Sequence, residues 1–181
     1  PSHYDVLGID KKASDTEKII KSLKSNNGIY LVPAFTGLGA PYWAVNARGI
    51  LSGLTRDTGP KEIVRATVES VAYQTHDLFE AMKNDGLKPK IIKVDGGMVK
   101  NNWFSQFLAD VVDIKVLRPK VDETTALGAA FMAGLQIGVY KSLEDISDNW
   151  QPDRSFNPKM KSYERKKLID GWDKAIKKTL S

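Results

Sequence analysis

The sequence predicts an α/β fold in which helices flank a mixed sheet. Helical and strand patterns alternate along much of the chain, which is typical of a sheet that is at least partly parallel. The helical segments repeat apolar residues every three or four positions, whereas the strand candidates are short apolar runs rich in β-branched residues. Because no internal repeat or low-complexity linker interrupts this order, we expect a single domain over residues 1–181.

The first expected element is a helix within an N-terminal helical segment, residues 1–26. Ser14 and Glu17 have the spacing of a capping box, which satisfies free N–H groups at the start of a helix. Asparagines and Gly28 follow, and such residues commonly terminate helices. We therefore expect the helix to run from about Ser14 to residue 25.

Two short strands are expected next, at 28–35 and 49–54, because both segments are apolar. Pro33 has no N–H to donate, so the first strand should lie at a sheet edge or contain a bulge. The loop between the strands is rich in glycine and proline, yet it contains Tyr42 and Trp43, whose large rings favour burial. Such a loop is typical of a site wall or a structural corner.

The clearest helix lies within residues 58–86. Pro60 falls in its first turn and Gly86 just after its end, and both positions are favoured for these residue types. We interpret its apolar stripe as core rather than as a cofactor site. The stripe comprises Ile63, Val64, Thr67, Val68, Val71, Ala72, Leu78, Phe79 and Met82.

A strand over "KIIKV" ends in Asp95, Gly96 and Gly97, before an amphipathic helix that starts near Asn101. Glycines let a ligand touch the backbone, and a helix N-terminus offers free N–H groups with a partial positive charge. Ligands of open α/β sheets bind at the carboxyl ends of strands, where this corner would lie. The position favours a nucleotide, although an ordinary turn that starts a helix stays open.

The remaining chain should contain a strand at 114–119, a helix at 124–138, a connecting segment at 147–158 and a C-terminal helix within 150–181. The helix at 124–138 is crowded with glycine and alanine, which let another backbone approach closely. We expect its small residues to face the sheet or the glycine corner, namely Ala126, Gly128, Ala129, Ala130 and Gly134.

Composition excludes several classes of function. The net charge of +5 lies on helix faces with interspersed acids, without the basic stripe and aromatics of a nucleic-acid binder, so no nucleic-acid partner is expected. No apolar run is long enough for a membrane span. The lack of cysteine fits a cytoplasmic protein. His3 and His76 cannot form a zinc site by themselves, and we expect no metal site in the chain.

Several long motifs resemble the glycerol kinases, members of the carbohydrate-kinase family related to actin and hexokinase. "VPAFTGLGAPYW" followed by "ARG" is similar to the C-terminal domain of these kinases, and "GILSGLTRDTGPKEIVRATVES" fits the second signature of the wider family. "VDGGMVKNNWFSQFLAD" resembles the family's adenosine-binding corner, and "RPKVDETTALGAAFMAGLQIG" resembles the segment that follows it. The similarity extends from about Asn27 to the C-terminus.

The resemblance implies an actin-like, ribonuclease H-like ATPase domain, the C-terminal half-domain of a two-domain kinase. The implied reaction transfers the γ-phosphoryl of ATP to glycerol and gives glycerol 3-phosphate, with Mg²⁺ held mainly outside this chain. The resemblance implies that Gly97 and Asn101 contact the nucleotide. Gly96 and Met98 are the next candidates. No catalytic residue is assigned here, because the base and the glycerol contacts belong to other parts of such kinases. We therefore expect the chain alone to be inactive.

Other polar residues near these motifs receive structural interpretations. Asp95 is expected to satisfy N–H groups of its turn. Arg48, Arg56 and Arg118 could approach phosphate, but an ion-paired or solvated arginine is the commoner outcome.

One residue departs from the family's pattern, and it weakens the hydrogen bonds expected in its loop: the relatives carry an aspartate after the tryptophan of "GLGAPYW", where this chain has Ala44. Two alternatives stay open. The first is another carbohydrate kinase of the same family, which "GLGAPYW" disfavours, and the second is a non-catalytic nucleotide-binding module. The sequence also leaves a homo-oligomer open.

Overall fold

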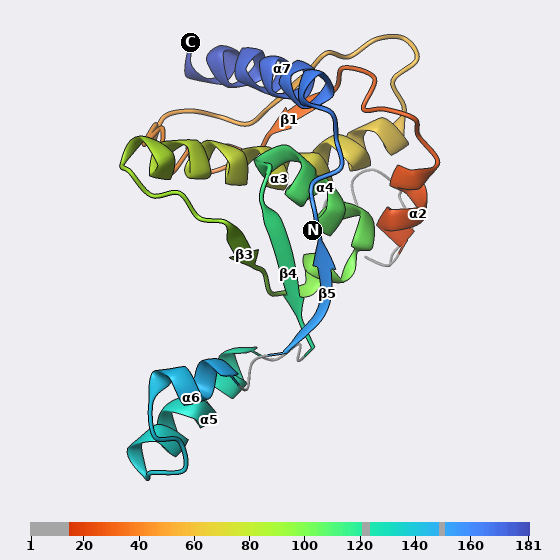
Figure 1. The fold of residues 1–181 in the computed structure, drawn as a ribbon. Coiled ribbons are helices and arrows are strands. Elements are labelled where there is room, and N and C mark those ends of the chain that lie inside the picture. Colours follow the sequence, from red (N-terminus) through yellow and green to blue (C-terminus); the bar gives the residue numbers. More distant parts are fainter. Residues whose placement is uncertain (1–14, 121–123, 149–150) are drawn as a thin grey trace.

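The structure, a computed structural model of the 181-residue chain, describes residues 15–120, 124–148 and 151–181. Helices and strands alternate as predicted, so the mixed α/β class is confirmed. Figure 1 shows two parts. Residues 15–120 and 151–181 form what we call the body, and residues 124–148 form an arm that projects from it.

The body begins with a short helix and a two-stranded sheet. Helix α2 spans Asp15–Lys21, strand β1 spans Tyr30–Val32 and strand β2 spans Ile50–Ser52. The strands pair antiparallel, and Pro33 directly follows β1 rather than lying within it. Helix α2 is shorter than predicted, and Ser14 of the expected capping box lies outside the described residues.

The loop between β1 and β2 buries only one of the two aromatic residues expected to be buried there. Tyr42 is half-buried, and its hydroxyl donates to Asp77 Oδ2 at 2.8 Å. The expectation was wrong for Trp43, which is 75% exposed. Trp43 closes a surface turn, in which it donates its N–H to Gly39 O and has a left-handed φ of 51°.

The second sheet is mixed, with three strands in the order β3-β4-β5. Strand β3 pairs parallel with β4, which pairs antiparallel with β5. Strand β5 lies in the segment expected to be a connection, so that prediction was wrong. This exposed edge strand buries only Phe156 and therefore lacks the apolar run by which strands are recognised. The strands span Ile91–Lys93, Lys115–Pro119 and Pro152–Phe156.

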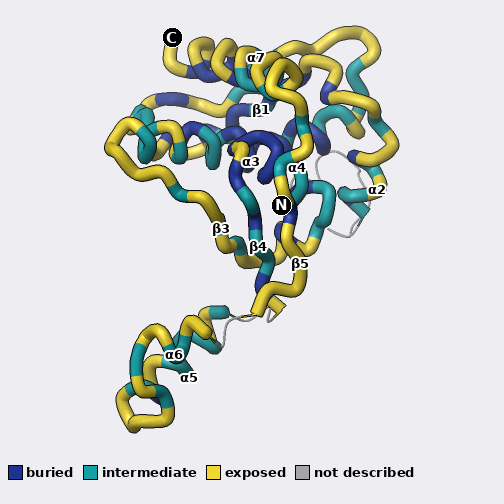
Figure 2. The backbone as a smooth tube through the Cα atoms, in the orientation of Figure 1, coloured by how far each residue is buried: buried dark blue, intermediate teal, exposed yellow. Residues whose placement is uncertain are grey.

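Three helices enclose the core of the body. Figure 2 shows the buried segments gathered where these helices meet β1 and β4. At the centre, the ring of Tyr73 stacks on Trp172 with centroids 5.3 Å apart and meets Phe107 edge-on at 5.7 Å. The core helices are α3 (Pro60–Asn84), α4 (Asn102–Val112) and α7 (Ser162–Leu180).

The core contains a paired charge on α3. Glu69 is fully buried, and its carboxylate accepts hydrogen bonds from Arg65 Nε at 2.7 Å and from the Tyr73 hydroxyl at 3.0 Å. Burial raises the pKa of Glu69 above its usual range. The chain leaves α2 early and brings Asn26 inward, where its side-chain amide also donates to Glu69, at 3.1 Å. This buried network ties the N-terminal segment to α3.

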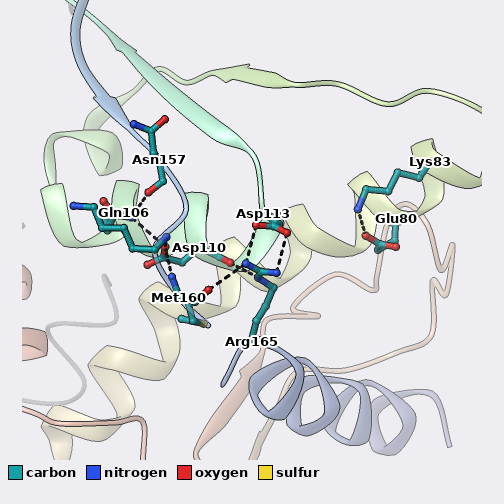
Figure 3. A network of polar contacts seen from close by, with 9 residues as sticks. Glu80, Lys83, Gln106, Asp110, Asp113, Asn157, Met160 and Arg165 are labelled. Atoms are coloured by element: carbon teal, nitrogen blue, oxygen red, sulfur yellow. Dashed lines mark hydrogen bonds and ion pairs between the residues drawn. The ribbon is translucent and has the colours of Figure 1, made fainter. Parts of the chain in front are cut away.

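A second polar network joins the end of α4 to the start of α7 (Figure 3). Asp110 Oδ1 accepts the backbone N–H groups of Lys159 and Met160. Arg165 donates from Nε to Asp110 O at 2.6 Å, and its two terminal nitrogens pair with Asp113 at 2.7 and 2.9 Å. These bonds fix the C-terminal segment against α4.

The arm contains helices α5 (Thr124–Gln136) and α6 (Leu143–Asp148). Only Gly134 is buried in these two helices, and the ring of Tyr140 lies against it. A Cβ added to Gly128 would meet no atom within 4 Å. The prediction that the small residues of α5 face the sheet or the glycine corner was therefore wrong, because α5 lies out in the arm (Figure 1).

Candidate nucleotide-binding corner

The glycine corner lies at the edge where the parallel strands β3 and β4 both end. The Val94 N–H, just after β3, still donates to Leu117 O at 3.0 Å, and Asp95 then leads the chain out of the sheet. Gly96 has a φ of 97°, a left-handed value that favours glycine. A short 3₁₀ turn, η1 (Gly97–Lys100), connects this corner to α4. The corner thus occupies the strand end that the sequence predicted.

Gly97 differs from Gly96 because the fold does not require a glycine there. Its φ lies outside the left-handed region, and an added Cβ would meet no described atom within 4 Å. The next residue, Met98, is 43% exposed. A side chain at position 97 would therefore project into open space beside the corner.

Asn101 caps helix α4. Its side-chain oxygen accepts the backbone N–H of Phe104 at 3.0 Å, and its amide nitrogen lies 3.4 Å from the Thr16 hydroxyl. Asn101 therefore has a structural role as the N-cap of this helix. Its side chain also joins the start of α4 to α2, so a loss of Asn101 would affect more than a ligand contact.

Asp95 joins the corner to the arm. Its carboxylate accepts the hydroxyl of Thr124, the first residue of α5. This hydrogen bond, with one from the Gly96 backbone, holds the pKa of Asp95 below its usual value. Asp95 was expected to accept N–H groups of its turn, and the hydrogen bond from the Gly96 backbone agrees with that expectation.

The three arginines considered as phosphate contacts have different surroundings. Arg48 donates to the backbone oxygens of Val45 and Ala47. Arg118 forms an ion pair with Asp153, with a shortest N–O distance of 2.5 Å, and it stands next to the corner. Arg56 is exposed in the loop after β2. An ion-paired arginine was the outcome that we favoured, and Arg118 fits it.

A cavity of about 1110 Å³ lies elsewhere in the body, between the segment 24–28 after α2, helix α4 and helix α7. Arg65, Trp103 and Lys174 contribute to its lining, but none of the four predicted nucleotide contacts does. Among the described residues, every buried side-chain nitrogen and oxygen already has a hydrogen-bond partner. The cavity therefore presents no buried polar group that lacks a partner and could receive a ligand.

The described parts of the chain contain neither a cluster of metal ligands nor a membrane-spanning helix. No group of three histidine, cysteine, aspartate or glutamate residues is placed to hold a metal ion within residues 15–120, 124–148 and 151–181. None of the helices in these same ranges is long and apolar enough to cross a bilayer.

Two side chains beside the corner were missed at the sequence level. Thr124 bonds Asp95, and a threonine before an alanine-rich helix is a cap signal that could have indicated a role for it. Asp153 pairs with Arg118, but it lies on β5, which carries no recognisable strand pattern. The sequence therefore contained no signal for Asp153.

The chain matches known proteins along most of its length. The family model described as "FGGY family of carbohydrate kinases, C-terminal domain" matches residues 8–137. The chain is 51% identical to glycerol kinase from Coxiella burnetii (strain RSA 493 / Nine Mile phase I) and 53% identical to glycerol kinase 1 from Pseudomonas aeruginosa PAO1. Both alignments cover 98% of this chain, which spans only 35% and 36% of the length of those relatives.

Solved structures show the same relationship. A crystal structure of Plasmodium falciparum glycerol kinase with ADP matches with a TM-score of 0.89 and 34% identity, covering 99% of this chain and 36% of that one. A ligand-bound xylulose kinase from Lactobacillus acidophilus matches with a TM-score of 0.81, covering 96% of this chain and 35% of that one. Its 23% identity shows a shared fold alone.

The mixed sheet and its flanking helices thus define a carbohydrate-kinase domain of the actin-like ATPase fold. The chain belongs to the FGGY family of carbohydrate kinases, and the matched part is the C-terminal domain of that family.

Proposed function

We propose that this chain is the nucleotide-side portion of an ATP-dependent glycerol kinase. The complete enzyme would transfer the γ-phosphoryl of ATP to glycerol and release glycerol 3-phosphate. The observation that carries the proposal is the glycine corner, which lies at the ends of two parallel strands and leaves open space in front of Gly97. The curated relatives reported above are named as glycerol kinases, and the solved P. falciparum glycerol kinase contains ADP.

In this proposal the corner binds the nucleotide through its backbone and through the side-chain amide of Asn101. Gly96 and Gly97 let the ligand lie against the main chain, and Met98 adds an exposed apolar side chain. The N-terminus of α4 contributes a partial positive charge. The Asn101 side-chain oxygen is engaged in the cap, and its amide nitrogen donates to the Thr16 hydroxyl, so the second hydrogen of that nitrogen is the group that would reach the adenosine.

The remaining chemistry is assigned to parts of the complete kinase outside this chain. Mg²⁺ would be held by the nucleotide phosphates and by those other parts. The acceptor site and the base are assigned outside this chain as well. Rate enhancement in phosphoryl transfer comes mainly from positioning and charge stabilisation, so this chain would contribute by orienting ATP. We place the enzyme in the cytoplasm.

Two other functions compete with this proposal. Xylulose and gluconate kinases share the fold, but the matches to solved examples have 24% identity or less, whereas the solved glycerol kinase has 34%. A non-catalytic nucleotide-binding module would keep the corner without kinase activity. Assaying the complete kinase with glycerol, xylulose and gluconate separates these functions. A preference for xylulose or gluconate would indicate another carbohydrate kinase, and no turnover of any of them would indicate a non-catalytic module.

The test of the corner is Gly97→Val in the complete kinase. The valine would occupy the ligand's space without touching described protein atoms, so the KM for ATP should rise about tenfold, equal to ~1.4 kcal/mol. The KM for glycerol and the melting temperature should stay nearly unchanged. Gly39→Val is the matched control, because Gly39 also has no atom within 4 Å of an added Cβ and no left-handed φ.

Asn101→Ala extends this test. It should weaken nucleotide binding and also lower stability by about 1 kcal/mol through loss of the cap. If Gly97→Val leaves the ATP affinity of the folded protein unchanged, the corner is only a turn and the nucleotide assignment is wrong.

A further inference from the structure

Arg118 stands at the end of β4, directly beside the glycine corner, and its side chain is only 16% exposed. Its Nη1 donates to Val99 O at 3.0 Å, to Lys100 O at 3.4 Å and to Asn102 Oδ1 at 3.1 Å. These three acceptors belong to the last two residues of η1 and to the first residue of α4. One side chain thus spans the junction between the corner and the helix.

The other side of the guanidinium is held by β5. Nε and Nη2 of Arg118 both donate to Asp153 Oδ2, at 3.0 and 2.5 Å. The guanidinium carbon also lies 5.8 Å from the centroid of the Phe156 ring. All three guanidinium nitrogens therefore donate to protein acceptors, two of them to Asp153 and one to the junction between η1 and α4.

The corner needs such support because its own residues supply little. Gly96 has a left-handed backbone and no side-chain cap bond, and Gly97 is exposed. Below the glycines, Val99 O accepts a second bond from the Ser105 hydroxyl at 3.0 Å. The strands β4 and β5 are thus connected to the corner through Arg118, whose planar fork can bond several acceptors at once.

We propose that Arg118 is a positioning residue for nucleotide binding. It contacts no nucleotide, but it holds the η1 backbone so that Gly97 and the α4 N-terminus present a fixed surface to the ligand. The inference rests on the proposed function, because it concerns the same corner. Asp153 has a supporting role in that it orients the guanidinium.

The first experiment compares Arg118→Met with Arg165→Met in the complete kinase. Arg165 is the matched control, since it also bonds backbone carbonyls and an aspartate, but at the far end of α4 (Figure 3). Arg118→Met should raise the Kd for ADP and the KM for ATP roughly tenfold, with the KM for glycerol unchanged. Arg165→Met should lower the melting temperature and leave nucleotide affinity intact.

Hydrogen exchange supplies a readout that is independent of turnover. Backbone amides of residues 97–102 should exchange faster in Arg118→Met than in the parent protein, and Arg165→Met should leave them unchanged. If both variants lower the melting temperature equally and neither changes ADP affinity, Arg118 is a purely structural residue and the inference fails.

Two further variants separate positioning from direct contact with phosphate. Lysine keeps the charge but not the planar fork, so Arg118→Lys should bind ADP nearly as weakly as Arg118→Met. Asp153→Ala should weaken ADP binding a few-fold, because the guanidinium loses its anchor. A direct phosphate contact makes the opposite forecast: Arg118→Lys would preserve affinity, and removal of the Asp153 charge would tighten binding.

The Gly97→Val variant distinguishes failure of this inference from failure of the proposed function. If Gly97→Val weakens ADP binding while Arg118→Met does not, the corner binds nucleotide without help from Arg118. If neither variant alters ADP affinity, the nucleotide assignment is wrong and the role of Arg118 is wrong with it.

Discussion

The body and the arm differ in how far they bury their apolar side chains. In the body, α4 is buried along most of its length, α7 buries one face, and residues such as Trp172 and Val111 are completely buried. In the arm, α5 carries no charged residue, yet Met132 is 56% exposed, and Ile137 just after the helix is 76% exposed. A helix that is apolar on all sides is normally buried. Among the described residues, the Tyr140 ring covers Gly134, and the other residues of α5 stay exposed or half-buried.

The comparison shows that small residues allow close packing without specifying where it occurs. We expected close approach along α5, whose glycines and alanines are exposed or half-exposed except for Gly134. Within α5 a close approach is found at Gly134, against the Tyr140 ring, and a closer one occurs in α7. There Gly171 faces Tyr30 of β1 so closely that an added Cβ would lie 2.2 Å from the tyrosine oxygen. Packing is thus decided by what lies opposite a helix, which its composition does not reveal.

The largest effect is expected when the buried charge of the body loses its partner. Glu69→Ala would leave the Arg65 guanidinium, whose side chain is 11% exposed, without its carboxylate. It would also remove the acceptor of the Tyr73 hydroxyl. We expect a loss of about 3–5 kcal/mol in the free energy of unfolding, measured by chemical denaturation.

The control for this change lies on the same helix. Glu80 is exposed and pairs with Lys83 one turn away, so Glu80→Ala should change stability by no more than about 0.5 kcal/mol. Equal losses for the two variants would show that the Glu69 network contributes no more than a surface ion pair.

A smaller loss is expected where α7 approaches β1. Gly171→Ala would place a methyl group against Tyr30, which is 8% exposed and packed beside Tyr73. Overpacking should lower the free energy of unfolding by about 1–3 kcal/mol. The better helix propensity of alanine should offset up to ~1 kcal/mol of that loss. A net loss of about 1 kcal/mol should appear in thermal unfolding. A stabilised variant would mean that Tyr30 moves aside without cost.

The sequence predicted those features of the body that depend on residues close together in the chain. Pro60 marks the start of α3. The apolar spacing predicted its buried face only in part, because Val64, Val68 and Ala72 are buried but Leu78 is 42% exposed. The glycine corner was located from a strand end, two glycines and a following amphipathic helix, and the structure has all three in that order. Which ligand the corner binds is a matter of resemblance, and that assignment remains a proposal.

Features that depend on distant residues were not predictable. Strand β5 forms because Arg154 and its neighbours pair with β4, and its polar residues carry no strand signal. Arg118 acquires its role only when Asp153 and the η1 carbonyls are brought to it. Trp43 is exposed because of a turn whose backbone angles are not evident from the residue types. Each of these features depends on tertiary context that overrides local preference.

The smallest effect is expected from the arm, where the same kind of substitution as in α7 should have the opposite sign. Gly128→Ala adds a methyl group that meets no described atom within 4 Å, so only helix propensity should count. We expect a gain of up to about 1 kcal/mol in arm stability, visible as slower amide exchange within α5.

Gly128→Leu sharpens this test, because a large side chain detects a neighbour that a methyl group could miss. In the 181-residue chain it should leave the melting temperature unchanged, since leucine is also a good helix former and the space beside position 128 is open. Gly171→Leu is the matched control in the body and should destabilise strongly through overpacking against Tyr30. A clear drop in melting temperature for Gly128→Leu would show that α5 packs against the body in solution, and the contrast between body and arm would then be wrong.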